Sequence, residues 1–122
     1  MPGSNPQSLT VGAGAERRRI AYLREPAAAA DKPGLVWLCG LKSDMVSTKA
    51  SAVAEWAASQ GRACLRFDYS GHGQSDGKFE DGTVSRWLEE TRAAFTRLTQ
   101  GPQVLVGSSM GGYMALLLLR AL

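Results

Sequence analysis

The sequence predicts an α/β fold, a three-layer sandwich whose mostly parallel sheet begins with an N-terminal antiparallel hairpin. Three observations support this prediction. Short apolar runs alternate with stretches of helical length along most of the 122 residues, as in strands joined by crossover helices. Residues 35–39 are continuously apolar, which is typical of a strand buried on both faces. Residues 84–98 carry apolar side chains at intervals of three and four, which indicates an amphipathic helix.

The N-terminal region is expected to form a tail and a hairpin. Residues 1–8 are polar and contain two prolines, so they are expected to be disordered. Residues 9–11 and 18–23 are short extended runs on either side of a glycine-rich segment, 12–16, and this arrangement is typical of a hairpin. A loop containing two prolines separates the hairpin from the apolar strand at 35–39.

The first helix is predicted over residues 48–60, followed by a strand at 63–67. Gly61 occupies the position of a C-terminal helix cap. The face expected to be buried consists of Val53, Trp56 and Ala57.

A long glycine-containing loop, 68–82, leads to the second helix. Thr83 is a suitable N-cap for that helix. A strand is predicted at 103–106, and it leads through a glycine-rich turn to the helical segment 113–118.

Composition and charge limit the possible functions. The net charge is +3, and basic residues are mixed with acidic ones except at 17–19, which we interpret as a solvated face and not as a nucleic-acid site. No apolar run approaches the roughly 20 residues of a membrane span, and no signal-peptide core is present, so a cytoplasmic protein is expected. Cys39 and Cys64 lie in apolar runs and are expected to be buried free thiols.

No cofactor or metal is expected. The glycine patterns at 71–76 and 107–112 lack the residues that phosphate binding requires. No cluster of histidine, cysteine or carboxylate side chains has the spacing of metal ligands.

Residues 107–111 form a Gly-x-Ser-x-Gly motif between the last strand and the last helix. A strand that turns sharply into a helix at a serine exposes the side-chain oxygen. Such a turn strains the serine backbone, and the residues two before and two after it, Gly107 and Gly111, must be small. The helix start supplies backbone N–H groups where negative charge develops during acyl transfer. Ser109 is therefore predicted to be a nucleophile and not merely an N-cap serine.

Together with two earlier segments, this motif resembles the α/β-hydrolase superfamily. The matching segments, in chain order, are 38–41, 67–77 and 106–112. The resemblance covers residues 9–122 and implies the N-terminal half of one domain, a truncated α/β-hydrolase fold that ends within the helix after the serine. Segments 64–77 and 101–112 are most similar to small serine esterases that hydrolyse acyl glucuronides or remove palmitoyl groups from protein cysteines.

The resemblance also implies roles for individual residues. The backbone N–H groups of Leu41 and Met110 are expected to form the oxyanion hole. The catalytic histidine and acid of the family follow the serine in the chain, and no histidine follows Ser109 in this sequence. Residues 42–45 are expected to border the acyl pocket.

Three upstream residues could be mistaken for the missing triad members. His72, the only histidine, is interpreted as a surface residue of a structural turn. Asp68 is expected to bind backbone N–H groups of its own loop. Asp76 precedes the serine and is therefore not expected to be the triad acid.

The function implied by the resemblance is hydrolysis of carboxylic esters or thioesters, in small molecules or acylated proteins, through an acyl-enzyme intermediate. Residues 1–122 alone are expected to be almost inactive, because loss of a triad partner costs on the order of a millionfold. Their strand at 103–106 would be an uncovered apolar edge, so association or partial disorder is expected. Two alternatives remain open: a non-catalytic half-domain that binds a partner or a complementary fragment, and an acyltransferase that uses the same serine.

Overall fold

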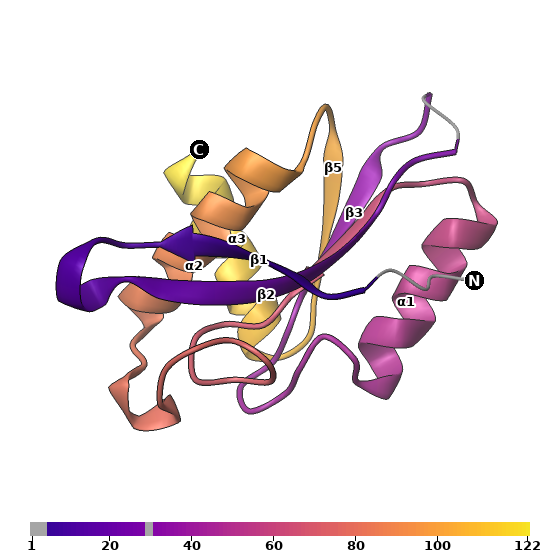
Figure 1. Ribbon diagram of the computed structural model, residues 1–122. Helices are drawn as coiled ribbons and strands as arrows, with labels where there is room; N and C mark the ends of the chain where they lie inside the picture. The colour runs from indigo at the N-terminus through magenta and orange to yellow at the C-terminus, as the bar shows by residue number, and fades with distance from the viewer. Residues whose placement is uncertain (1–4, 29–30) are drawn as a thin grey trace.

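A five-stranded sheet lies between one helix on one face and two helices on the other in the computed structural model, which describes residues 5–28 and 31–122 (Figure 1). The strands are β1 (Gln7–Val11), β2 (Arg18–Glu25), β3 (Gly34–Leu38), β4 (Cys64–Phe67) and β5 (Gln103–Gly107). Their spatial order is β1-β2-β4-β3-β5. Strands β3, β4 and β5 are parallel, whereas β2 is antiparallel to both β1 and β4. The predicted α/β sandwich with an N-terminal hairpin is confirmed.

The hairpin is longer than predicted at both ends. Strand β1 begins at Gln7, so the prediction of disorder is wrong for Gln7 and Ser8, which pair with β2. Residues 1–4 lie outside the described residues. Strand β2 continues to Glu25, and its last residues pair with β4. A short 3-10 helix, η1 (Gly14–Glu16), forms the loop of the hairpin.

Arg18 is buried, so the solvated face predicted for residues 17–19 is wrong at its central position. Its Nε lies 2.8 Å from Oε2 of the fully buried Glu90, and its Nη2 lies 2.6 Å from Oε1 of Glu89. The other oxygen of Glu90 accepts a hydrogen bond from the Ser70 N–H at 2.7 Å. Because a buried charge is costly unless it is paired, these contacts explain how Arg18 and Glu90 are accommodated in the core.

Helix α1 (Thr48–Ser59) covers one face of the sheet (Figure 1). It ends as predicted, with Gly61 in the left-handed region at φ +70°. The side chains that it buries are Ala50, Ala54 and Ala57. Trp56 was predicted to be buried but is 51% exposed, with the Arg62 guanidinium 5.7 Å from its ring centroid. Alanines let the helix lie close to the sheet, and the larger indole remains outside.

Helix α2 (Val84–Leu98) lies on the opposite face together with α3 (Met110–Ala121) (Figure 1). The predicted cap is confirmed, because the Thr83 hydroxyl accepts a hydrogen bond from the Arg86 N–H at 3.1 Å. The buried residues of α2 are Trp87, Glu90, Thr91 and Ala94. The loop before α2 contains a 3-10 helix, η2 (Phe79–Asp81).

The carboxylate of Asp68 joins the loop after β4 to the loop after β3. Its Oδ2 accepts from the Gln74 N–H at 2.9 Å, which confirms the predicted bond within its own loop. Its Oδ1 accepts from the Met45 N–H at 2.8 Å. Burial raises the pKa of Asp68, while the two N–H bonds act in the opposite direction. One buried side chain therefore fixes two loops at the carboxyl end of the parallel strands.

Helix α3 begins in close contact with the end of β3. A Cβ on Gly111 would collide with the Leu38 carbonyl oxygen, and a Cβ on Gly107 would collide with the Gly111 backbone. The two glycines are therefore required by packing, as the sequence predicts. Strand β5 is at an edge of the described sheet, as expected, and its Val104 is 46% exposed.

Replacing Asp68 with alanine should lower the free energy of unfolding by about 3 kcal/mol, because two backbone N–H groups lose their acceptor. Urea unfolding followed by circular dichroism measures the change. The exposed Asp81 provides the matched control, and Asp81→Ala should unfold at the same urea concentration as the parent. Equal midpoints for both variants would show that the Asp68 bonds contribute nothing.

Neighbouring glycines allow a second test. Gly111→Ala should destabilise the fold by about 2 kcal/mol or more, because its Cβ has no room beside the Leu38 carbonyl. Gly112→Ala should be tolerated, since its Cβ would lie 3.8 Å from the Gly107 oxygen, an ordinary contact. Thermal unfolding of the two variants makes the comparison, and similar melting temperatures would contradict the packing argument.

Candidate functional site

Ser109 lies at the turn between β5 and α3 with a strained backbone. Its φ is +57° and its ψ is −119°, a conformation that non-glycine residues rarely adopt. The side chain makes no capping hydrogen bond to the first turn of α3, so the hydroxyl is not used as an ordinary N-cap. Ser109 is exposed at the carboxyl end of the parallel strands. The predicted strand–turn–helix geometry is confirmed, and the chemical role of Ser109 remains a prediction.

The loop after β3 lies against this turn. A Cβ on Gly40 would be 3.1 Å from the Ser108 carbonyl oxygen and 3.7 Å from the Ser109 Cβ. The next residue, Leu41, has a side chain that is 50% exposed and therefore does not pack into the core. Within the described part of the chain, neither the Leu41 N–H nor the Met110 N–H donates a hydrogen bond. Both predicted oxyanion donors are thus free of internal acceptors.

One lysine contacts the turn, and a second lies on the loop after β3. The Lys49 ammonium lies 3.5 Å from the Ser108 hydroxyl oxygen. Lys42 directly follows Leu41, and its ammonium lies 5.0 Å from the Phe79 ring centroid, within the range of a cation–π contact. Lys42 also has a positive φ, +62°, and Ser109 is the other non-glycine residue with this property in the described chain. Strained backbone is therefore concentrated in the two segments that meet at the turn.

The prediction that residues 42–45 border an acyl pocket is wrong for Met45. Met45 is fully buried and packs with Ala21 and Leu23, because its N–H is bound by Asp68 and the residue is held inside the loop. Lys42 is exposed, and Ser43 and Asp44 are partly exposed. Sequence spacing could not separate Met45 from these residues, since its burial depends on an acceptor 23 positions away.

His72 is buried and not a surface residue, which corrects the prediction. Only 5% of it is exposed, and its ring centroid lies between 5.3 and 5.6 Å from those of its aromatic neighbours. These neighbours are Tyr69, Phe79 and Trp87. Its Nδ1 lies 3.0 Å from the Ser70 carbonyl oxygen, and since a carbonyl can only accept, Nδ1 carries the proton. His72 makes no hydrogen bond to Ser109.

Both cysteines are buried free thiols, as predicted. Cys39 lies beside Gly40, close to the turn, and burial raises the pKa of its thiol to about 12. Burial also raises the pKa of Cys64 to about 11. Because the thiolate is the reactive form, neither cysteine is in its nucleophilic form near neutral pH.

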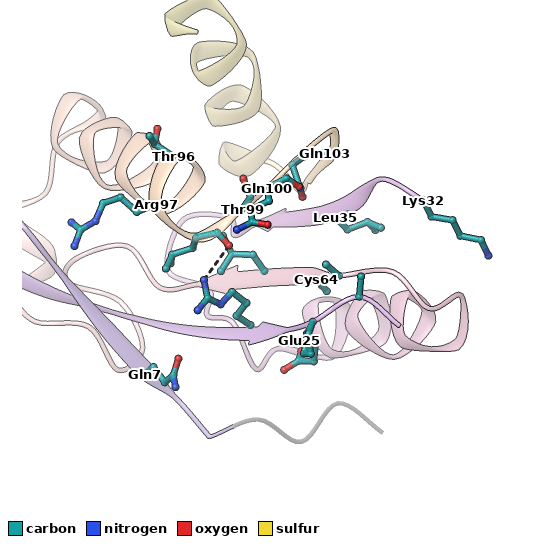
Figure 2. A pocket seen from close by; sticks show the side chains of 17 residues that line it. Gln7, Glu25, Lys32, Leu35, Cys64, Thr96, Arg97, Thr99, Gln100 and Gln103 are labelled. Atoms are coloured by element: carbon teal, nitrogen blue, oxygen red, sulfur yellow. Dashed lines mark hydrogen bonds between the residues drawn. The ribbon is translucent and has the colours of Figure 1, made fainter. Parts of the chain in front are cut away.

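A cavity of about 910 Å³ lies at the opposite end of the parallel strands (Figure 2). It is lined by the beginnings of β3 and β4 and by the C-terminal end of α2. At the end of α2, the Leu98 carbonyl accepts a hydrogen bond from Arg24 of β2 at 3.4 Å. Gly34 and Leu35 line this cavity, whereas Leu38, at the other end of β3, contacts the start of α3. The cavity is therefore separate from Ser109, and its one cysteine, Cys64, has a protonated thiol.

The described residues contain neither a candidate metal site nor a candidate membrane-spanning helix. No group of three or more histidine, cysteine or carboxylate side chains is arranged to hold a metal ion there. None of the helices in the same part of the chain has the length and apolar character needed to cross a membrane.

Comparison with curated proteins shows similarity to palmitoyl-protein thioesterases. Over 84 residues the chain is 46% identical to the human protein named palmitoyl-protein thioesterase ABHD10, mitochondrial, and 44% identical to its mouse counterpart. These alignments cover 69% of this chain and 28% of each relative. The predicted similarity to thioesterases of this type is confirmed.

Solved structures share the fold over almost the whole chain. A putative hydrolase from Agrobacterium vitis superposes with a TM-score of 0.93 at 47% identity, and mouse alpha/beta hydrolase domain-containing protein 10 superposes with a TM-score of 0.86 at 36% identity. Each match covers 97% of this chain and 45% of the other. The chain thus spans less than half the length of these relatives.

The family model described as serine aminopeptidase, S33 (Hydrolase_4) matches residues 35–121, a stretch that begins in β3 and includes the Ser109 turn and α3. The match agrees with the strand order and with the sharp turn at the end of β5. The chain therefore belongs to the Hydrolase_4 family of α/β-hydrolases.

Proposed function

We propose that the protein containing this chain is a serine hydrolase that cleaves carboxylic esters or thioesters through an acyl-enzyme intermediate. The observation that carries the proposal is the backbone of Ser109, strained at φ +57° and with a hydroxyl that caps no helix. A serine held in this way is exposed for attack on a carbonyl carbon. Membership of the hydrolase family and similarity to named thioesterases support the same reaction.

In the proposed reaction, the Ser109 oxygen attacks the carbonyl carbon of the substrate and transfers its proton to a base. The carbonyl oxygen becomes negatively charged and accepts hydrogen bonds from the N–H groups of Leu41 and Met110. Each such donor is worth roughly 10²- to 10³-fold in rate. The intermediate then expels an alcohol or a thiol, which takes up the proton, and water later releases the acyl group from the serine.

The proposed base and acid come from outside residues 1–122. His72 is unsuitable as the base, because its ring is buried among aromatic side chains and its Nε2 atom, the nitrogen that would have to take the proton, makes no hydrogen bond to Ser109. Asp68 is unsuitable as the acid, because both of its oxygens accept backbone N–H groups. A histidine and a carboxylate from another segment would complete the triad.

The proposed substrates carry an apolar acyl group, in a small molecule or on a protein cysteine. Leu41 and Val46 expose apolar side chains on the loop that lies against the serine turn, and an acyl chain could bury this surface. Transfer of the acyl group to an alcohol in place of water would use the same serine and the same loop.

A non-catalytic half-domain is the second candidate function. Its specific support is the apolar surface on β5 and α3, where Val104, Leu116 and Leu119 are each about half exposed or more. Leu116 and Leu119 lie one turn apart on α3, and exposed apolar side chains placed together in this way are typical of an interaction surface. Such a chain would bind its partner without needing a reactive serine.

A fluorophosphonate probe distinguishes these functions. The complete protein containing residues 1–122 should be labelled at Ser109, and Ser109→Ala should abolish the labelling. Ser108→Ala is the matched control, since it removes the adjacent hydroxyl and should leave labelling intact. Mass spectrometry of the modified peptide identifies the site.

The chain of residues 1–122 by itself should be labelled several orders of magnitude more slowly than the complete protein, because it lacks a base near Ser109. Rapid labelling of residues 1–122 would show that the base lies within them. Absence of labelling in the complete protein would favour the non-catalytic half-domain.

A further inference from the structure

The carbonyl group of Cys39 is held between the loop after β4 and the start of α3. The Tyr69 hydroxyl donates a hydrogen bond to this carbonyl oxygen at 2.8 Å. From the other side, Gly111 approaches so closely that a Cβ there would lie 2.9 Å from the same oxygen. Cys39 immediately precedes Gly40 and Leu41, the segment that lies against Ser109.

Tyr69 is itself rigidly placed. It is fully buried, and its ring packs edge-on against Phe67 and His72 with centroids 5.5 and 5.6 Å away. Burial raises the pKa of Tyr69 far above its usual value, so its hydroxyl keeps the proton that it donates. The ring therefore holds a permanent donor at a defined point beneath the Cys39 carbonyl.

The loop that contains Leu41 is consequently fixed near both of its ends. Tyr69 binds the Cys39 carbonyl at the beginning, and the neighbouring Asp68 binds the Met45 N–H at the end. Between these points, the Gly40 carbonyl accepts a hydrogen bond from the Ser43 N–H at 3.1 Å, which closes a turn that contains Leu41. Gly40 has no Cβ to limit rotation between this turn and the Cys39 peptide group. The Tyr69 bond restricts the peptide group that precedes Gly40.

We propose that Tyr69 is a positioning residue for the oxyanion hole: by binding the Cys39 carbonyl, its hydroxyl keeps the Leu41 N–H directed at the oxyanion formed above Ser109. This inference rests on the proposed serine-hydrolase function. The oxyanion exists only in the transition state and the intermediate, and so a displaced donor lowers kcat and leaves substrate binding unchanged.

Tyr69→Phe in the complete protein provides the test, because it removes one oxygen and keeps the ring. We expect kcat for a thioester substrate to fall roughly threefold to tenfold, the effect of one buried hydrogen bond, with KM unchanged. Tyr22→Phe is the matched control, since it removes the hydroxyl of another buried tyrosine, on β2, that does not bind Cys39. Tyr22→Phe should keep the parental kcat.

Amide NMR relaxation gives a second measurement that does not require turnover. The Leu41 N–H should have a lower order parameter in Tyr69→Phe than in the parent, while the Ala54 N–H inside α1 should be unchanged. If the variant is too unstable for kinetic assays, the relaxation comparison is made in a stabilising osmolyte. A parental order parameter at Leu41, or a fall in kcat equally large in Tyr22→Phe, would overturn the proposal.

The Ser109→Ala variant separates failure of the serine-hydrolase proposal from failure of the role proposed for Tyr69. If Ser109→Ala keeps parental turnover, the serine-hydrolase proposal is wrong whatever Tyr69 does. If Ser109→Ala is inactive and Tyr69→Phe keeps the parental kcat, the proposed function stands and the role of Tyr69 is wrong.

Discussion

The close approach of α3 to β3 is the constraint on which the rest of the structure depends. Gly111 leaves space for the Leu38 carbonyl, and Gly107 leaves space for Gly111. With the helix this near the sheet, the chain has only Ser108 and Ser109 in which to reverse direction between β5 and α3. The serine backbone is therefore driven into a strained conformation, and its side chain is exposed where the parallel strands end.

Hydrogen bonds from the loop after β4 then organise the surroundings of the turn. Asp68 and Tyr69 are adjacent in sequence, and they bind opposite ends of the loop after β3. The Glu90 carboxylate in turn binds the Ser70 N–H and Arg18. A continuous set of buried polar contacts thus extends from the hairpin, through α2, to the loop beside Ser109. Buried networks of this kind fix geometry because each unsatisfied member would be costly.

Local signals in the sequence were sufficient for the order of the elements and for the turn at Ser109. Thr83 caps the start of α2 and Gly61 follows the end of α1, as the sequence predicts, because caps depend on neighbouring backbone groups. Burial of polar residues could not be predicted in the same way. Arg18 is buried because it pairs with Glu90, which is 72 positions away in the sequence. His72 is buried because the rings of Trp87 and Phe79 pack against it. Those partners are defined only by the tertiary fold.

The conformation of Ser109 also has an evolutionary consequence. A φ of +57° with a ψ of −119° is a region that glycine adopts with little penalty and serine does not. Glycine at this position would relax the backbone and increase the stability of the domain, but it would remove the hydroxyl. Under the proposed serine-hydrolase function, selection for stability and selection for reactivity act in opposite directions at this single residue.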